Sequence, residues 1–335
     1  MNKNKVLLID ALYINAGGGL NLLEYLIESL IDRKIDFCLL QDNRCGKLKN
    51  NDKISTVYRL NASLLNRYVF YRKHRNEFLA VLCFANIPSP IKLSCPVYTY
   101  VHNANLLKIP KELSLSRKIL TCCKRLVIRA LASNTDFWVV QTENMFNLLR
   151  RFFQNSENIY ILPFYKSMPF IENESKRNDY ILVGNYTGTR GHEELIEAWR
   201  VLYNKGITPK LHLTVDNPLF NSKIEEAKNL GLTIINHGLI PFAEISELYH
   251  KCKATVYPSI NESLGLGLIE AMESGCDVIA PDLPYVWSVC HPSELFDIHD
   301  IDSMVDAVIR YESGTSKKSI LTIENKIEEL IDLLK

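Results

Sequence analysis

The chain has 335 residues, of which 47% are hydrophobic and 23% are charged, and its net charge is +1. These fractions are those of an ordinary globular protein, and the length exceeds what one hydrophobic core usually supports, so we expect two domains. No apolar stretch reaches the roughly 18 residues of a membrane span, and no cleavage-site pattern follows the N-terminus. The sequence therefore excludes a secreted or a membrane-spanning protein and favours the cytoplasm.

The nine cysteines are scattered, except for the neighbours Cys122 and Cys123. None has the Cys-x-x-Cys or Cys/His spacing of a zinc site. We therefore expect a reduced chain without structural metal.

The two halves of the chain differ in charge. Residues 1–165 hold 23 Lys and Arg against 12 Asp and Glu, whereas the remainder holds 16 against 26. Such a split suggests that the first half meets an anionic surface or substrate. No nucleic-acid-binding motif accompanies the basic residues, so no nucleic-acid partner is expected.

The first 40 residues have the pattern of a βαβ unit in a parallel sheet. Apolar strands are predicted at Val6–Ile9 and Phe37–Leu40, and leucines at helical spacing predict a helix between them. Three glycines at 17–19 stand in the loop before this helix, where they let a ligand approach the backbone. A dinucleotide-binding fold, with Asp42 as the ribose acceptor, is the alternative. It is disfavoured because the glycines lack GxGxxG spacing.

A histidine follows another predicted strand of the first half. Strands are predicted at Leu79–Phe84 and Val97–Val101, and His102 comes directly after the second. Ligands of open α/β sheets bind beyond the carboxyl ends of the strands, so His102 is placed for function. A histidine that only makes a structural hydrogen bond would look the same in the sequence.

Two segments of the first half combine basic with apolar or aromatic residues. Residues 66–78 interleave arginine, lysine and histidine with tyrosine and phenylalanine. A helix is predicted at Ser116–Leu131, with one stripe formed by Ile119, Cys122, Cys123, Leu126 and Ala130 and another by Lys118, Arg125 and Arg129. Such a helix can lie on an anionic membrane, or it can pack on the core and expose a solvated basic face. A strand at Phe137–Gln141 and a helix at Asn144–Phe153 follow.

A polar stretch without hydrophobic periodicity, at 166–179, is the predicted linker between the domains. A second βαβ series follows, with strands at Tyr180–Val183, Leu211–Val215, Thr233–Asn236 and Ala254–Tyr257 and helices at 192–202, about 221–230 and 243–251. The second domain is expected at 180–320. The last segment, 321–335, forms a terminal helix that can cross back to the first domain.

The stretch 259–281 has the most specific pattern in the chain. A loop with Glu262, Gly265 and Gly267 leads into a short helix with Glu270, and Gly275 has the form of the glycine that ends a helix, before a strand at 276–280. Loop amides and a helix N-terminus bind anions, and two carboxylates accept hydrogen bonds from hydroxyl groups. A nucleotide sugar has both an anionic phosphate and hydroxyl groups. An ordinary strand-loop-helix-strand unit with two solvated glutamates is the alternative.

These residues together resemble glycosyltransferase family 4, retaining enzymes of the GT-B fold, over nearly the whole chain. Residues 258–275, PSINESLGLGLIEAMESG, are similar to the family's motif that begins Pro-Ser-x-x-Glu-x-Phe-Gly and ends in Glu-Ala, with Leu264 in place of Phe. Residues 183–191, VGNYTGTRG, are similar to Val-Gly-Arg followed by Lys-Gly, and His102 in VHN is similar to the strand-end histidine. The resemblance implies an α/β protein with two doubly wound Rossmann-like domains that face each other across a cleft, 1–165 for the acceptor and 180–320 for a nucleotide sugar.

The resemblance also implies roles for individual residues. Glu262 contacts the donor sugar, Glu270 binds the ribose hydroxyls, and His102 faces the reacting centre. The catalytic residues are then His102, Glu262 and Arg190. The remaining donor-binding positions are Gly17, Gly18, Gly19, Gly184, Asn185, Leu264, Gly265 and Leu266, with the first three glycines allowing the domains to close over the donor phosphate.

The reaction implied by the resemblance requires neither a metal, a cofactor nor a protein nucleophile. A sugar passes from UDP or GDP to a glycan acceptor, which we expect to be lipid-linked at the inner membrane leaflet during synthesis of O-antigen, lipopolysaccharide or capsule. The protein would then be peripheral on that membrane face. One departure is Asn185, which stands where the family usually has Arg. The alternative is therefore a non-catalytic GT-B subunit that supports a partner transferase.

Overall fold

The computed structural model describes residues 5–154, 158–169, 171 and 177–335. Contacts divide the chain into two units. Unit 1 comprises residues 1–109, 114–166 and 324–335, and unit 2 comprises residues 110–113 and 167–323. The change of unit between residues 166 and 167 falls inside the stretch predicted as a linker, of which residues 170 and 172–176 lie outside the described residues.

Unit 1 is built on one parallel sheet in the order β3-β2-β1-β4-β5-β6-β7. Its strands are β1 Val6–Ala11, β2 Phe37–Asp42, β3 Thr56–Leu60, β4 Phe78–Cys83, β5 Val97–Val101, β6 Phe137–Val140 and β7 Ile159–Ile161. Its helices are α1 Gly17–Asp32, α2 Leu64–His74, α3 Ala104–Leu107, α4 Leu115–Leu131, α5 Glu143–Phe153 and α12 Ile327–Leu333, with 3-10 turns η1 Asn51–Lys53 and η2 Ala132–Asn134.

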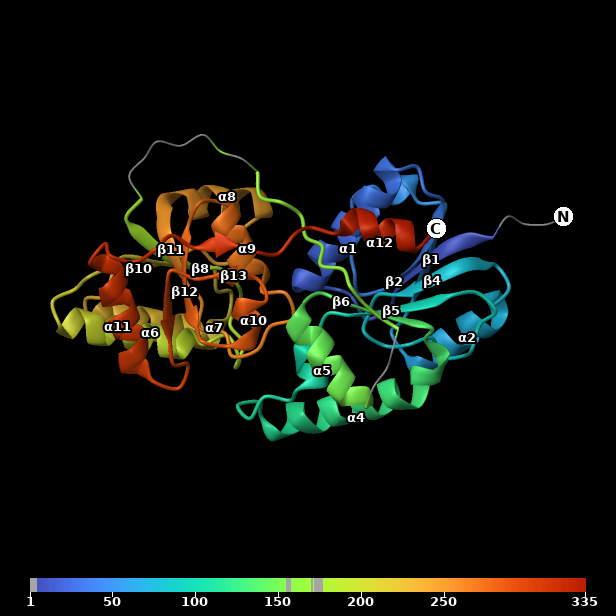
Figure 1. Cartoon of the computed structure of the whole chain (residues 1–335), viewed down its shortest axis with the longest axis horizontal. Helices are drawn as coiled ribbons and strands as arrows, with labels where there is room; N and C mark the ends of the chain where they lie inside the picture. Colours follow the sequence, from blue (N-terminus) through green and yellow to red (C-terminus); the bar gives the residue numbers. More distant parts are fainter. Residues whose placement is uncertain (1–4, 155–157, 170, 172–176) are drawn as a thin grey trace. The chain divides into compact units, whose positions relative to one another are not determined.

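The helices of unit 1 cover both faces of the sheet. Figure 1 shows α1 and α12 on one face and α4 and α5 on the other. Val97 and Val101 point to the same face of β5 because they are four residues apart. Val97 packs with the core residues of α2, and Val101 packs with those of α3, α4 and α5. The helices α2 to α5 therefore share one face.

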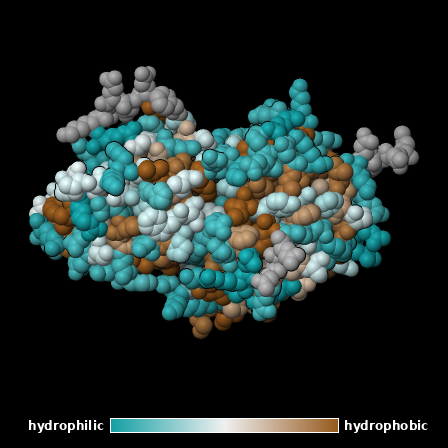
Figure 2. Space-filling view, in the orientation of Figure 1, coloured by the Kyte–Doolittle hydropathy of each residue, from teal (hydrophilic) through white to brown (hydrophobic). Residues whose placement is uncertain are grey.

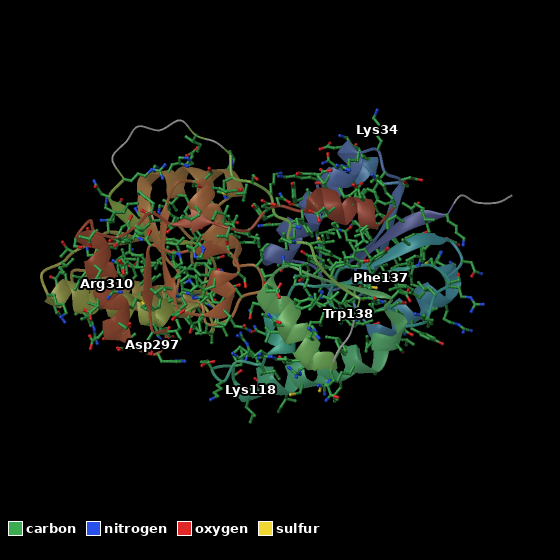
Figure 3. The ribbon with its side chains drawn as sticks, in the orientation of Figure 1. Lys34, Lys118, Phe137, Trp138, Asp297 and Arg310 are labelled. Carbon is green, nitrogen blue, oxygen red and sulfur yellow. The ribbon has the colours of Figure 1, made fainter. Side chains whose placement is uncertain are left out.

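Unit 2 contains a second parallel sheet, in the order β10-β9-β8-β11-β12-β14, and a short antiparallel pair, β13 with β15. Its strands are β8 Asp179–Leu182, β9 Leu211–Leu213, β10 Ile234–Asn236, β11 Cys252–Val256, β12 Asp277–Pro281, β13 Cys290–His291, β14 Glu294–Phe296 and β15 Ile320–Leu321. Its helices are α6 His192–Asn204, α7 Pro218–Asn229, α8 Phe242–Lys251, α9 Leu266–Glu273, α10 Pro284–Trp287 and α11 Ile301–Glu312. The edge helix α11 is joined to β14 by Arg310, whose Nε donates to Glu294 at 2.8 Å (Figure 3).

The predicted class, two doubly wound α/β domains, is confirmed. Two local predictions were wrong. The glycines at 17–19 do not form a loop: the connection after β1 is confined to residues 12–16, and α1 begins at Gly17 because its buried leucines anchor the whole segment to the sheet. Gly267, also predicted in a loop, lies in the first turn of α9, since Gly265 reverses the chain with a φ of +68°. Among the described residues, no helix has both the length and the apolar character needed to span a bilayer.

Candidate functional site

The candidate site lies in unit 2, at the carboxyl ends of β8 and β11. Successive strands run outward from β8 through β9 to β10, whereas β11 and β12 lie on its other side, so the strand order changes direction between β8 and β11. Open α/β sheets bind ligands at such a point. The two loops there contact each other: the Ile260 amide donates to the Thr189 carbonyl at 3.0 Å, and a side chain at Gly191 would collide with Pro258.

Glu262 is held in place by two hydroxyl groups. Its Oε1 accepts hydrogen bonds from the Ser259 hydroxyl at 2.8 Å and from the Tyr257 hydroxyl at 3.1 Å. The Tyr285 hydroxyl donates to the Ser259 carbonyl at 2.7 Å and so fixes the loop itself. Ser259 and Tyr257, the two donors to Oε1, come from the segment that follows β11, and they orient the Glu262 carboxylate before any ligand binds.

Arg190 lies over the backbone of Gly184. A side chain at Gly184 would collide with the guanidinium, and the φ of +131° at this position also favours glycine. The pKa of Arg190 is raised by the electrostatic influence of Tyr257, Glu262 and Glu270, although burial opposes this rise. Within the described ranges no carboxylate lies at ion-pair distance from the guanidinium. Arg190 therefore keeps its hydrogen-bond donors for an anion.

Glu270 lies on α9, where burial raises the pKa of its carboxyl to about 7; nearby Arg190 lowers this pKa and Glu273 raises it. The side chain retains some exposed surface. None of the described groups donates a hydrogen bond to it. A carboxyl group of this kind suits hydroxyl donors that a ligand brings, because it is only partly solvated and has no protein partner.

The turn before α9 presents backbone amides rather than side chains. Leu264 is 2% exposed, so it contributes to the core through its side chain and to the site only through its amide. Gly265 caps α9, and Leu266 is its first residue. Gly267 sits so close to the Tyr257 ring that a Cβ would lie 2.7 Å from ring atom Cε2. This close approach brings the N-terminus of α9 to the edge of the sheet.

Asn185 is engaged with the backbone. Its Oδ1 accepts hydrogen bonds from the Tyr186 amide at 2.9 Å and the Asp216 amide at 3.0 Å, and its Nδ2 donates to the Asp216 carbonyl at 3.2 Å. The side chain thus joins the loop after β8 to the loop after β9. The asparagine has a structural task here, which a longer arginine could not perform with the same bonds.

His102, the predicted site residue of unit 1, follows β5. Its ring stacks on Phe84 at 5.2 Å between centroids, and Nε2 lies 3.0 Å from the Phe84 carbonyl. A carbonyl can only accept, so this contact is a hydrogen bond when Nε2 carries the ring proton. Burial lowers the pKa of His102 to about 4, so the imidazole is neutral at neutral pH.

The glycines of α1 lie beside this histidine. A Cβ at Gly19 would be 3.1 Å from Cε1 of His102. Gly17 and Gly18 complete the first turn, and Ala16 at the N-cap offers no side-chain acceptor. The first amides of α1 therefore lack a side-chain cap, as an anion site requires. Unit 1 thus brings together His102 and the glycines, and unit 2 brings together Gly184, Arg190, Glu262, Glu270 and the turn at 264–266.

Sequence reasoning missed Asn86, which fixes His102. Asn86 has a left-handed φ of +67°, and its Oδ1 accepts a hydrogen bond from the His102 amide at 2.7 Å. It also missed Tyr257 and Ser259 as partners of Glu262. The signal available for Asn86 was its place just after a strand, followed by Pro88, where a turn is expected.

Comparisons with known proteins match parts of the chain. A family model described as glycosyl transferases group 1 matches residues 165–327. Over 89 residues the chain is 33% identical to the O-antigen chain mannosyltransferase RfbU of Salmonella typhimurium, in an alignment that covers 23% of this chain and 25% of that protein. The matched part therefore spans about a quarter of the length of this curated relative.

Solved structures match nearly the whole chain. Sucrose-phosphate synthase from Thermosynechococcus elongatus has a TM-score of 0.72 at 16% identity, covering 92% of this chain and 90% of its own. The lipopolysaccharide glycosyltransferase WaaG has a TM-score of 0.68 at 13% identity, with 92% and 90% covered. The outer core galactosyltransferase WaaB has 0.66 at 17%, with 93% and 91% covered. At these identities the likeness establishes the fold, which is GT-B.

Proposed function

We propose that this protein transfers a sugar from a nucleotide-sugar donor to a hydroxyl of a glycan acceptor, because the glycosyl transferases group 1 model matches residues 165–327, which include nearly all of unit 2. Unit 2 binds the donor in this proposal, and unit 1 binds the acceptor. The observation that carries it is the meeting of Arg190, Glu262 and Glu270 at one sheet edge, beside the N-terminus of α9.

Each group has a distinct task. Arg190 and the amides of the turn at 264–266 stabilise the negative charge that develops on the diphosphate as it leaves. Glu270 accepts hydrogen bonds from the ribose hydroxyls, and Glu262 accepts them from the sugar through the oxygen that Ser259 and Tyr257 leave available. Stabilisation of the leaving charge is the largest of these effects, since removing one such donor typically costs 10²–10³ in turnover.

The step proceeds with retention of configuration. The acceptor oxygen bonds to the anomeric carbon on the face from which the diphosphate leaves, the bond from that carbon to the diphosphate oxygen breaks, and its electron pair stays with the diphosphate. The acceptor proton passes to a leaving phosphate oxygen. Positioning and charge stabilisation suffice for this chemistry, so we include metal independence in the proposal. Turnover should be unchanged by a chelator.

The acceptor is proposed to be a lipid-linked glycan of a cell-surface polysaccharide such as O-antigen. The excess of basic residues in 1–165 supports a membrane location for unit 1. The neutral His102 supports a role in hydrogen bonding to an acceptor or sugar hydroxyl, rather than in neutralising phosphate charge. The relation to a mannosyltransferase of O-antigen chains supports the same substrate class.

Thermal unfolding with a panel of UDP and GDP sugars tests the donor site. A nucleotide sugar at 100 times its Kd should stabilise the protein by about 2.7 kcal/mol. Glu262→Ala and Glu270→Ala should each lose this stabilisation and the sugar transfer. Glu225→Ala, which removes an exposed carboxylate on α7, is the matched control and should retain both. If no nucleotide sugar stabilises the native chain, the donor assignment is wrong and a non-catalytic subunit becomes the better account.

A further inference from the structure

Helix α4 exposes its apolar side chains to solvent. Leu115 is 74% exposed, Ile119 57%, Leu120 56% and Leu126 65%, and only Ile128 of this helix is buried. Cys122 and Cys123 are also exposed. Figure 2 shows hydrophobic residues at the surface over α4, bordered by hydrophilic ones. The stripe predicted to pack on the core or against a membrane thus does not pack on the core.

Basic residues hold the inner side of α4 instead. Nη1 of Arg125 donates to the carbonyls of Leu107 at 2.9 Å and Leu106 at 3.2 Å. The guanidinium groups of Arg125 and Arg129 lie 4.7 and 4.6 Å from the centre of the Phe152 ring. Two cation–π contacts and two hydrogen bonds therefore fix the helix with its leucines outward.

Helix α2, on the same face of the sheet, also exposes apolar side chains. Leu65 is 70% exposed, Val69 56%, Leu64 45% and Tyr68 42%, whereas Phe70 and Tyr71 fill the core. Eight large apolar side chains on two helices are thus exposed on one face of unit 1. Single exposed apolar residues are common on protein surfaces, but a concentration of this kind indicates an interaction surface.

The charges around this surface identify its partner. Neither α2 nor α4 contains Asp or Glu, and α4 has five basic residues, among them Arg117, Lys124 and Lys118, the last of which is labelled in Figure 3. Long basic side chains beside inserted apolar ones complement an anionic bilayer, since the stems lie along the apolar surface while the charged ends reach the headgroups. A protein partner would need acidic groups at the rim and an apolar centre at once.

We propose that α2 and α4 form the surface through which this protein docks on an anionic lipid bilayer, with Ile119, Leu120 and Leu126 inserted at the headgroup boundary. This surface deepens the proposed function, because a lipid-linked acceptor lies at such a bilayer. Docking rests on insertion as well as on charge, and the two contributions respond differently to salt.

The native cysteines provide the test. Cys122 and Cys123 are exposed on α4, and the other seven cysteines are buried, so an environment-sensitive thiol fluorophore labels this helix in the native protein. Vesicles of phosphatidylglycerol and phosphatidylethanolamine should shift its emission to shorter wavelength and protect the thiols of unlabelled protein from alkylation. Vesicles of phosphatidylcholine alone should do neither. No shift and no protection with anionic vesicles at low salt overturns the proposal.

Variants of the unlabelled protein separate insertion from charge. In vesicle sedimentation, Leu120→Glu should weaken binding at least tenfold even at low salt, and Lys124→Ala about fivefold, an effect that salt reduces. Leu219→Glu on α7 and Leu239→Glu, both of which change highly exposed leucines of unit 2, are the controls and should bind as the native chain does. If the native chain instead forms a dimer that protects Cys122 without lipid, a second copy covers this surface and the proposal is wrong. Nucleotide-sugar stabilisation, measured on the same preparations, reports separately on the donor site.

Discussion

Each unit has an arginine in contact with the carboxyl edge of its sheet, and the two arginines are held in opposite ways. In unit 1 Arg67 is 1% exposed: its Nε donates to Asp10 at 2.8 Å, Nη1 to the Pro88 carbonyl at 2.7 Å and Nη2 to the Ile87 carbonyl at 2.9 Å. In unit 2 Arg190 lies over Gly184 and forms no ion pair with any described carboxylate. Arg67 is saturated by the protein, and Arg190 is reserved for a ligand.

The difference shows why overall charge does not locate a site. Unit 1 contains most of the excess positive charge, but Asp10 neutralises its buried arginine and its edge presents the neutral His102. Several of its other basic residues lie on the helices α2, α4 and α5, away from this edge. The second half is acidic overall, yet its sheet edge carries the arginine that is available to an anion. The anion site is located by the charged side chain that has no ion-pair partner among the described residues, not by the net charge of the unit.

The largest expected effect is a loss of stability when Arg67, the arginine saturated by the protein, is replaced. Arg67→Met leaves the Asp10 carboxylate buried and without its cation, so unfolding by urea should show a loss of about 3–5 kcal/mol. The Tyr71 hydroxyl, which donates to Asp10 at 2.7 Å, compensates only in part. The double variant Asp10→Leu with Arg67→Met should lose less than the single variant. If the single and double variants are equally unstable, the unpaired Asp10 carboxylate is not the cause of the lost stability.

At Arg190 the effect should fall on function instead. Arg190→Gln should unfold at nearly the native temperature without ligand, because no described carboxylate loses an ion pair, while sugar transfer falls about 10²–10³-fold. Arg190→Lys should recover part of this loss, since it restores the charge without the planar fork. Arg200→Gln, which breaks an exposed pair with Glu197 on α6, should leave transfer unchanged. If Arg190→Gln without ligand loses as much stability as Arg67→Met, the proposed difference between the two arginines is wrong.

The pH dependence of donor binding should follow Glu270. Burial raises its pKa from 4.5 to about 7, so the protonated form is favoured in the folded state, and the folded state loses stability as the pH rises from about 4.5 through about 7. Ribose hydroxyls need the ionised form as acceptor, so nucleotide affinity should rise roughly tenfold between pH 6 and pH 8. Calorimetry in buffers of different ionisation enthalpy should detect proton release on binding near pH 7. Glu270→Gln should abolish both effects, and a pH dependence that survives this change would assign it to another group.

The sequence predicted the parts of this fold that periodicity and spacing determine. The strands β1, β2 and β5 have apolar runs, and the Glu262 to Glu270 stretch has fixed offsets; the structure places the strands, and the order of loop and helix in the stretch, as expected, although the helix begins before Gly267. The strands β3 and β7 were missed because they lie at sheet edges, where β3 alternates irregularly between exposed and half-buried residues. The exposure of the α4 leucines was beyond prediction, because a helical stripe does not reveal that arginines stacked on Phe152 occupy the inner side.

Substitution of Asn86 should have the smallest effect on sugar transfer. It should also distinguish the contribution of the sheet edge of unit 1 from that of unit 2. Asn86→Ala removes the acceptor of the His102 amide, so the imidazole loses its fixed position while the Phe84 carbonyl still accepts from Nε2. Transfer should fall about tenfold, through the KM for the acceptor or through kcat, because the lost hydrogen bond is worth about 1 kcal/mol and the ring is no longer aligned. The Kd for the nucleotide sugar, which unit 2 determines, should not change. Asn86→Asp keeps an acceptor oxygen and tolerates the left-handed backbone, so it should recover much of the loss. A change in the Kd for the nucleotide sugar would show that the two edges are not independent, and the division of tasks between the units would then fail.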